Sequence, residues 1–318
     1  MKVLQITSNY PTTAYPVFGI FVKEQIESLQ KAGVECDIYF SNGKENGGMK
    51  AHIASIFTVW KLIHKNHYDV IHCHHSISGL ILLLSGGAFT HKCVVSYQSD
   101  PNREFGGKWL FHLLYLSFNK IIIKNTSEYQ REKKVVYLPN GTNSSFFKPM
   151  DKSQCRKELG WDVNKHYVLY MDSNAGTRTV KRHDRYEEVL KILNKEFGDV
   201  VSVELTNTPR ERIPIFMNAC DLHLMTSDFE GSPNSVKECL CCNTPVVSTD
   251  VGNVRDMMGD IPGCYVTKEK NASELAECAS KVFRSKEPFN GRELFLAKGY
   301  GIENVAEKLK NVYQSILN

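Results

Sequence analysis

The sequence lacks the two glycine-rich signatures that most often mark a phosphate site. Neither of the expected domain-opening strands is followed by Gly-x-Gly-x-x-Gly, and Gly-x-x-x-x-Gly-Lys-Ser/Thr does not occur in the 318 residues. A dehydrogenase that depends on a dinucleotide therefore has little support. Any phosphate that this chain binds must be held by other groups.

Long apolar runs are also missing. The segments at 77–89 and 109–123 are interrupted by glycine or polar residues, and neither reaches the ~20 residues that span a bilayer. The segment at 109–123 could lie on a membrane surface, but a core helix that runs into a strand is the commoner explanation. The N-terminus opens directly in a strand pattern without signal-peptide architecture, so we expect a cytoplasmic protein.

The ten cysteines form no metal or disulfide pattern. Cys239 and Cys242 make a lone Cys-x-x-Cys without a second pair or a histidine cluster. Metal binding and redox chemistry are therefore less favoured than small, buried helix residues. With reduced thiols as the default for such a protein, we expect no disulfide framework.

Charge is unevenly distributed along a chain whose net charge is only +4. Residues 1–150 carry 16 Lys and Arg against 10 Asp and Glu, and the remaining residues carry 23 against 25. The first half is therefore the basic one. This bias favours contact with an anionic membrane surface or a phosphorylated acceptor, although a solvated surface explains it as well. We expect no nucleic-acid partner.

Strand and helix patterns alternate along the whole chain, which is typical of α/β domains with parallel sheets. The expected strands lie at 2–8, 34–40, 68–74, 93–97, 120–124, 135–138, 167–171, 200–205, 221–225, 245–249 and 264–266. The turn-rich stretch at 139–149 separates the two sets. We therefore expect one domain at 1–148, a second at 149–300, and a last helix within 301–318 that packs back toward the first domain.

The stretch at 226–247 connects two expected strands through a loop and a helix. A loop of small residues that opens a helix presents unpaired N–H groups, which suit a phosphate. Glu230 and Glu238 bracket this site, and carboxylates prefer hydroxyl donors to phosphate. A ligand with a phosphate and many hydroxyls is a nucleotide sugar. The alternative is an ordinary βαβ turn with solvated acids.

The stretch at 226–247 and several motifs elsewhere in the chain resemble those of the retaining glycosyltransferases of family 4, which have the GT-B fold. The motifs follow one another in the same order as in that family. The resemblance covers nearly the whole chain. Its motifs are a glycine-containing first loop and helix (Gly19 to Gly33), a strand end Asp-Val-Ile-His-x-His (Asp69 to His74), a Pro-Asn-Gly linker (Pro139 to Pro149), a basic pair (Arg178 and Lys181), Glu-x7-Glu (Glu230 and Glu238) and the stretch Pro245 to Gly252.

The resemblance implies two doubly wound Rossmann-like domains that face one another across a cleft. The second domain would bind a UDP- or GDP-sugar, and the first most of the acceptor. Arg178 and Lys181 would neutralise the diphosphate, Glu230 would contact the transferred sugar and Glu238 the ribose. Further donor-binding residues would be Gly19, Ser232, Asn234, Ser235, Val236 and Gly252.

The family uses neither a cofactor nor a divalent metal, and it retains the anomeric configuration, most simply by a front-face route. This chain departs from it at one place. Where many members carry a histidine, it has Gln98, which cannot act as an acid or base. Gln98, which can hydrogen-bond a sugar hydroxyl, is an acceptor-side candidate together with Asp100 and His74. The connection at 125–134 is also short for the family.

The leading hypothesis is a metal-independent hexosyltransferase that acts on a hydroxyl of a cell-surface glycan or lipid-linked precursor. It would work in the cytoplasm, at the inner face of the membrane if the basic first domain makes a peripheral contact. Two alternatives stay open. One is a partner subunit that binds a nucleotide sugar or glycan without turnover, and the other, ranked lower, is a sugar-nucleotide epimerase.

Overall fold

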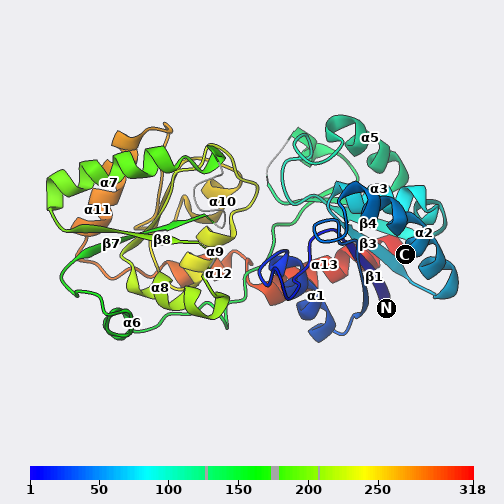
Figure 1. Cartoon of the computed structure of the whole chain (residues 1–318), viewed down its shortest axis with the longest axis horizontal. Helices are drawn as coiled ribbons and strands as arrows, with labels where there is room; N and C mark the ends of the chain where they lie inside the picture. Colours follow the sequence, from blue (N-terminus) through cyan, green and yellow to red (C-terminus); the bar gives the residue numbers. More distant parts are fainter. Residues whose placement is uncertain (126–127, 173–178, 207) are drawn as a thin grey trace. The chain divides into compact units, whose positions relative to one another are not determined.

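The computed structural model describes residues 1–125, 128–172, 179–206 and 208–318. The chain forms two compact units: unit 1 comprises Met1–Gly141 with Ile302–Asn318, and unit 2 comprises Thr142–Gly301 (Figure 1). Each unit is built on a parallel sheet with helices on both faces. The α/β fold class predicted from the alternating pattern is therefore confirmed.

The sheet of unit 1 has six parallel strands in the order β2-β1-β3-β4-β5-β6. Their bounds are β1 Lys2–Thr7, β2 Glu35–Phe40, β3 Val70–His74, β4 Lys92–Ser96, β5 Lys120–Ile123 and β6 Val135–Tyr137. The register pairs Thr7 with His74 and His74 with Ser96, so these three residues end neighbouring strands at one edge of the sheet. In parallel sheets this carboxyl edge is where ligands bind.

Helices cover both faces of this sheet. Their bounds are α1 Ile20–Lys31, α2 Met49–Lys65, α3 Ser76–Leu84, α4 Gly87–Thr90, α5 Gly107–Ser117 and α13 Ile302–Leu317. Leu29 of α1 and Leu309 of α13 pack against Val3 and Val94. The opposite face is buried by α2, α3, α4 and α5. Each face thus has its own apolar core.

The sheet of unit 2 has five parallel strands in the order β11-β10-β9-β7-β8. Their bounds are β7 His166–Met171, β8 Val200–Leu205, β9 Leu222–Met225, β10 Val246–Ser248 and β11 Tyr265–Val266. The helices are α6 Lys152–Leu159, α7 His183–Phe197, α8 Ile213–Ala219, α9 Asn234–Cys241, α10 Val254–Met258, α11 Ala272–Arg284 and α12 Gly291–Ala297. Helices α7 and α11 cover one face, and α8, α9, α10 and α12 the other.

The crossover predicted at 226–247 is present. Strands β9 and β10 pair in parallel with His223 opposite Val246, and α9 connects them. Helix α9 begins at Asn234, directly after Pro233. The short helices α4, α10 and α12 were not predicted, because four to seven residues carry too little periodicity to identify a helix. Within the described ranges, no helix is both long and apolar enough to cross a bilayer.

Helix α13 is attached to unit 1 by a buried polar contact as well as by its apolar face. The hydroxyl of Tyr313 lies 2.6 Å from His72 Nδ1, and the other ring nitrogen of His72 lies 2.7 Å from Ser96 Oγ. Gln5 Nε2 donates to the same tyrosine at 3.4 Å. Burial and the nearby charge of Lys124 lower the pKa of His72 to about 3, so its ring is neutral at pH 7.

Substitution Tyr313→Phe should lower the free energy of unfolding by roughly 1–3 kcal/mol, because it leaves a nitrogen of the buried His72 without its partner. Urea denaturation and amide hydrogen exchange over Ile302–Leu317 would measure the change. Tyr15→Phe, at a tyrosine that is 40% exposed, is the matched control and should change little. Equal stability of the two variants would contradict the role given to the hydroxyl.

Candidate functional site

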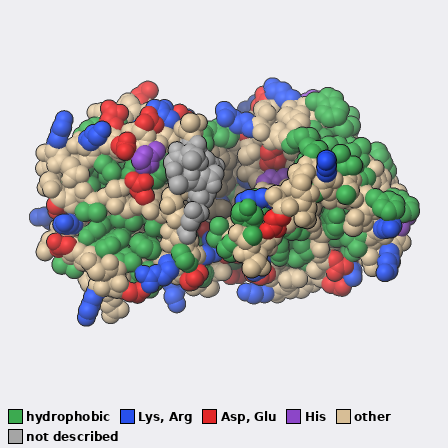
Figure 2. Space-filling view, viewed as in Figure 1, with side chains coloured by type: hydrophobic (Ala, Val, Ile, Leu, Met, Phe, Trp, Pro, Cys, Tyr) green, Lys and Arg blue, Asp and Glu red, His purple; other side chains and the backbone are tan. Residues whose placement is uncertain are grey.

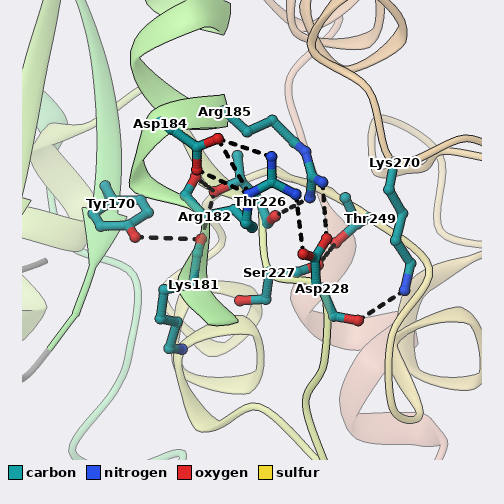
Figure 3. Close-up of polar contacts among 10 residues, drawn as sticks. All are labelled: Tyr170, Lys181, Arg182, Asp184, Arg185, Thr226, Ser227, Asp228, Thr249 and Lys270. Atoms are coloured by element: carbon teal, nitrogen blue, oxygen red, sulfur yellow. Dashed lines mark hydrogen bonds and ion pairs between the residues drawn. The ribbon is translucent and has the colours of Figure 1, made fainter. Parts of the chain in front are cut away.

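The carboxyl edge of the unit 2 sheet is organised by one carboxylate held between two guanidinium groups. Asp228, in the loop after β9, accepts from Arg182 at 3.0 Å and from Arg185 at 2.8 Å (Figure 3). Arg185 also donates to the carbonyl of Thr226 at 2.6 Å. Burial alone would raise the pKa of Asp228, but these two cations hold it below its usual value. The loop is therefore fixed to the start of α7.

The same contacts position Lys181, the last residue of a short 3-10 helix (η2, Thr179–Lys181). Its carbonyl accepts from the hydroxyls of Thr226 at 2.9 Å and Tyr170 at 3.3 Å. The amide of Asp228 donates to the carbonyl of Val180 at 2.9 Å. In Figure 3 the side chain of Lys181 extends away from the two arginines. Its backbone is thus fixed while its ammonium group reaches toward the following loop.

The ammonium group of Lys181 contacts the carboxylate of Glu230. Lys181 Nζ lies 2.6 Å from Glu230 Oε1, and Ser227 Oγ donates to the same oxygen at 2.9 Å. The side chains of Lys181 and Glu230 are only 12% and 15% exposed. An ammonium group has three donors and a carboxylate two acceptor oxygens, so both groups can also engage a ligand.

A glycine brings the loop after β10 against the loop that carries Glu230. A Cβ on Gly252 would lie 2.1 Å from the carbonyl oxygen of Gly231, and its φ of +56° is in the left-handed region. The amide of Asn253 donates to that same carbonyl at 3.2 Å. Only glycine satisfies both the close approach and the backbone angle. Gly252 therefore shapes the loop in which Glu230 lies.

Helix α9 presents its first amides beside this loop. Pro233 precedes the helix and has no side chain that could cap the N–H groups of Asn234, Ser235 and Val236. Ser235 Oγ lies 3.1 Å from Nε2 of the buried His223, and burial lowers the pKa of His223 to about 4. Val236 is fully buried, so only its backbone can reach a ligand. This helix start suits an anion.

A buried lysine lies under the same loop, and the sequence analysis missed it. Lys237 has no exposed surface, and its Nζ donates to Ser232 Oγ at 3.1 Å. Burial lowers its pKa to about 7, against the opposing effect of the neighbouring Glu238. Sequence alone offers one signal: a charged residue among the apolar positions of a short helix. Such a costly group is retained most often at functional sites.

Glu238 has a cationic partner that the sequence did not reveal. Arg210 Nη1, from the 3-10 helix Arg210–Arg212, lies 3.4 Å from Glu238 Oε1. The guanidinium of Arg210 also lies 5.5 Å and 5.1 Å from the ring centres of Phe146 and Phe147. Arg210 follows β8, so its position at the carboxyl edge could have been expected from the strand order alone.

In unit 1, Gly19 is required by the chain's own backbone. A Cβ there would lie 2.3 Å from the carbonyl oxygen of Asn9, and φ is +68°. Gly19 precedes the first residue of α1, and Asn9 lies in the loop after β1. The close approach that the structure shows is therefore between this glycine and Asn9, and its predicted role toward a diphosphate stays a prediction.

The histidines at the end of β3 have different environments. His74 is fully buried, and its Nε2 lies 2.9 Å from Gln5 Oε1. His75, the next residue, has a φ of 73° and a side chain that is 17% exposed. Its Nε2 lies 2.9 Å from Asn9 Nδ2. The left-handed backbone at His75 turns its ring to the carboxyl edge, whereas His74 stays within the core.

The carboxylate of Glu104 connects the start of α3 with the loop after β4 at this edge. Its carboxylate accepts from the amides of Ser76 at 2.9 Å, Gln98 at 2.5 Å and Ser99 at 3.0 Å, and lies 3.8 Å from His75 Nδ1. Burial would raise the pKa of Glu104, but His75 and these amides hold it below its usual value. The sequence analysis missed Glu104, because nothing in the local pattern indicates that the loop after β4 meets the start of α3 through this carboxylate.

The remaining predicted residues divide into two groups. Gln98 Oε1 accepts from Asn140 Nδ2 at 3.0 Å, and Asp100 Oδ1 accepts from the amide of Asn102 at 2.8 Å, both in unit 1. Arg178, predicted to be the partner of Lys181, lies outside the described residues. In unit 2 the structure brings together Lys181, Glu230, Ser232, Gly252 and the start of α9.

Part of the chain matches a known protein family. Residues 175–292 match the family model described as glycosyl transferases group 1. The chain is 23% identical to a putative teichuronic acid biosynthesis glycosyltransferase, TuaC of Bacillus subtilis (strain 168), and the similarity covers 88% of this chain and 89% of that one.

Solved structures share the fold across both units. Sucrose-phosphate synthase from Thermosynechococcus elongatus has a TM-score of 0.76 and 16% identity, with 99% of both chains covered. HepE of Anabaena, solved in complex with UDP, has a TM-score of 0.75 and 14% identity, and the match covers 99% of this chain and 100% of that one. At these identities the likeness concerns the fold.

Substitution Lys237→Met should raise the free energy of unfolding at pH 7, by roughly 1–4 kcal/mol, because an apolar side chain of similar length replaces a buried amine. The folded pKa of about 7 lies below the ordinary 10.5, so the unfolded chain binds more protons between these values. Wild-type stability therefore rises with pH across this window.

The gain of the Lys237→Met variant should accordingly be largest at pH 7 and shrink toward pH 10.5. Urea denaturation at several pH values measures it, with Lys191→Met, at an exposed lysine of unit 2, as the control. A variant that is less stable than wild type at every pH would show that the buried amine is a net stabiliser.

Proposed function

We propose that this chain is a retaining, family 4 hexosyltransferase, because residues 175–292 match the model of the glycosyl transferases group 1 and the chain has the GT-B fold. Its donor would be a UDP- or GDP-sugar, and its acceptor a hydroxyl of a cell-surface glycan or lipid-linked precursor. The observation that carries this proposal is the ion pair of Lys181 with Glu230 beside the start of α9, within the matched residues.

The diphosphate of the donor would lie against α9. The uncapped amides at 234–236 supply N–H donors, and Lys181 supplies a cation that is only 12% exposed. Negative charge grows on the diphosphate as its bond to the sugar breaks, and fixed donors of this kind stabilise that charge. Arg178 would add a second cation. No divalent metal is needed for this step.

The two glutamates would orient the sugars. Glu230 is fixed through Oε1 by Lys181 and Ser227, so its second oxygen can accept from a hydroxyl of the transferred sugar. Glu238, held by Arg210, would accept from the ribose hydroxyls in the same way. Neither glutamate transfers a proton in this proposal. This is consistent with the contacts of Glu230 to Lys181 and Ser227 and of Glu238 to Arg210.

Unit 1 would supply the acceptor side. Because His74 is buried and Gln98 cannot take a proton, His75 is the better candidate to hold the acceptor hydroxyl. In the proposed step the acceptor oxygen attacks the anomeric carbon on the face that the diphosphate leaves. The acceptor proton passes to the departing phosphate oxygen, so the anomeric configuration is retained.

Two further features belong to this proposal. The relative TuaC is named for teichuronic acid biosynthesis, which supports a surface polysaccharide as the product. The HepE structure contains UDP, which supports a uridine donor. The basic character of residues 1–150 supports cytoplasmic work at the inner face of the membrane, through a peripheral contact.

Substitution Glu230→Ala should reduce transfer at least ~100-fold, because it removes the acceptor of sugar hydroxyls and the partner of Lys181. Transfer from radiolabelled UDP- and GDP-sugars to extracted glycolipid, in the presence of EDTA, measures it. Glu293→Ala, at an exposed glutamate of unit 2, is the control.

Full activity of Glu230→Ala would refute the proposed site, and a wild type that needs added metal would refute the metal-free mechanism. Isothermal titration with UDP and GDP distinguishes an active transferase from the leading alternative, a partner subunit without turnover. Tight nucleotide binding without transfer would identify a partner subunit that has lost turnover, which the glutamine at position 98 would explain. Donor isomerised without an acceptor would instead identify an epimerase.

The two neighbouring histidines should respond differently to substitution. His75→Asn removes the imidazole from the carboxyl edge, so kcat/KM for the acceptor should fall at least ~10-fold. His74→Asn should instead lower stability, since it leaves a cavity in the core and displaces the partner of Gln5. Acceptor kinetics and urea denaturation of both variants test this, and unchanged kinetics for His75→Asn would exclude it from the acceptor site.

A further inference from the structure

One face of α2 carries a continuous stripe of large apolar side chains. Met49, Ile53, Phe57 and Trp60 follow one another at helical spacing and are 48%, 61%, 58% and 43% exposed. The opposite face, with Val59 and its neighbours, is buried in the core of unit 1. Helix α2 therefore has two apolar sides: one packs against the core of unit 1, and the other is exposed.

The aromatic part of this stripe is ordered by its own contacts. The rings of Phe57 and Trp60 stack with centres 5.7 Å apart, and Trp60 lies 4.8 Å from the ring of His64. Lys61 Nζ lies 4.3 Å from the centre of the Phe57 ring. An exposed aromatic pair with a cation on it is typical of a surface that is meant to meet a partner.

The charged residues within the helices of this face are all basic. Lys50, Lys61 and Lys65 are exposed on α2, and the sequences of α2, α3, α4 and α5 contain no Asp or Glu. Leu84, at the end of α3, and Phe89, in α4, add side chains that are 59% and 75% exposed. At the edge of unit 1 where Figure 1 draws α2, Figure 2 shows hydrophobic side chains beside Lys or Arg.

Similar composition continues on the next helix of this layer. Helix α3 packs between α2 and α5. The outer side of α5 carries Trp109 and Leu116, 70% and 76% exposed, with an exposed Lys108. Trp109 and Leu116 are seven residues apart, which is about two turns, so they lie on the same face of the helix. The exposed apolar side chains are thus a property of the layer rather than of one helix, whereas Lys108 of α5 pairs with Glu128 at 3.4 Å.

We propose that the exposed face of α2, defined by Met49, Ile53, Phe57, Trp60, Lys50, Lys61 and Lys65, docks on an anionic lipid bilayer. Apolar side chains on a helix with a lysine-bearing rim enter the interface between headgroups and acyl chains, while the lysines meet lipid phosphates. The charge pattern selects this occupant over a second copy of the chain. A two-fold symmetric contact would bring the lysines of one copy against those of the other.

This proposal names the surface for the peripheral contact inferred under the proposed function, and it does not depend on sugar transfer. Binding to vesicles needs neither donor nor acceptor. A failure of membrane docking would therefore leave the assignment of the glycosyl-transfer site standing, and loss of transfer would leave vesicle binding unchanged.

The test is co-sedimentation of the full chain with vesicles of phosphatidylcholine alone and with 30% phosphatidylglycerol, at two salt concentrations. Wild type should bind the anionic vesicles, and more weakly at high salt. The double substitution Phe57→Ser, Trp60→Ser should lower that affinity at least ~10-fold. Lys50→Gln, Lys61→Gln and Lys65→Gln should each lower it about fivefold and reduce the preference for anionic lipid.

Val163→Ser and Leu294→Ser, at side chains of unit 2 that are 58% and 48% exposed, are the matched controls and should bind like wild type. Circular dichroism and UDP binding confirm that each variant is folded. Two results would overturn the proposal: equal binding of wild type and the Phe57, Trp60 variant, or no binding to anionic vesicles. A dimer in sedimentation velocity that the same variant abolishes would assign the face to self-association instead.

Discussion

The placement of Lys181 beside Glu230 depends on how Asp228 is neutralised. The loop after β9 carries a carboxylate that two arginines hold at hydrogen-bonding distance, and this contact fixes the loop to the start of α7. Arg182 reaches it with a φ of 52°, a strained angle that the ion pairs offset. Because Glu230 is two residues further along the same loop, anchoring Asp228 sets the distance between the glutamate and the lysine. A looser loop would expose Lys181 and Glu230 to solvent, where their ion pair would contribute little stability.

Both units keep polar groups in places where apolar ones would be more stable. His72 is buried with a pKa of about 3, and Lys237 is buried with a pKa of about 7. Neither gains stability from its ability to carry charge, because burial disfavours the charged form. What each does is hold another group by a hydrogen bond: His72 holds Tyr313, and Lys237 holds Ser232. The first contact fixes α13 on the sheet of unit 1, and the second fixes the loop at Ser232 on α9.

The long periodic elements could be predicted from the sequence, and the contacts between distant loops could not. Glu230 and the start of α9 are close in the chain, so the local sequence pattern is enough to predict that they share one site. The partner of Glu238 was not, because Arg210 is 28 residues away and meets it only through the strand order of unit 2. The preference for His75 over His74 in the proposed acceptor site has a similar cause. Strand alternation indicates which side chains share a face, but the chain leaves the strand at His75 with a positive φ, which no periodicity reveals.

The distribution of charge along the chain indicates that a diphosphate and an anionic membrane surface would be recognised by different means. The residues that would meet a diphosphate lie in unit 2, within the part of the chain where acids slightly outnumber bases. There the shielded Lys181 and the start of α9 would act on the diphosphate at short range, where few water molecules compete for them. The basic excess lies instead in the first half of the chain, and α2 bears part of it on an exposed, acid-free surface. Charge exposed to solvent is effective only when it is repeated over an area and meets a surface that is itself extended. A bilayer is such a surface and a single diphosphate is not, which is why the excess is better explained by docking than by donor binding.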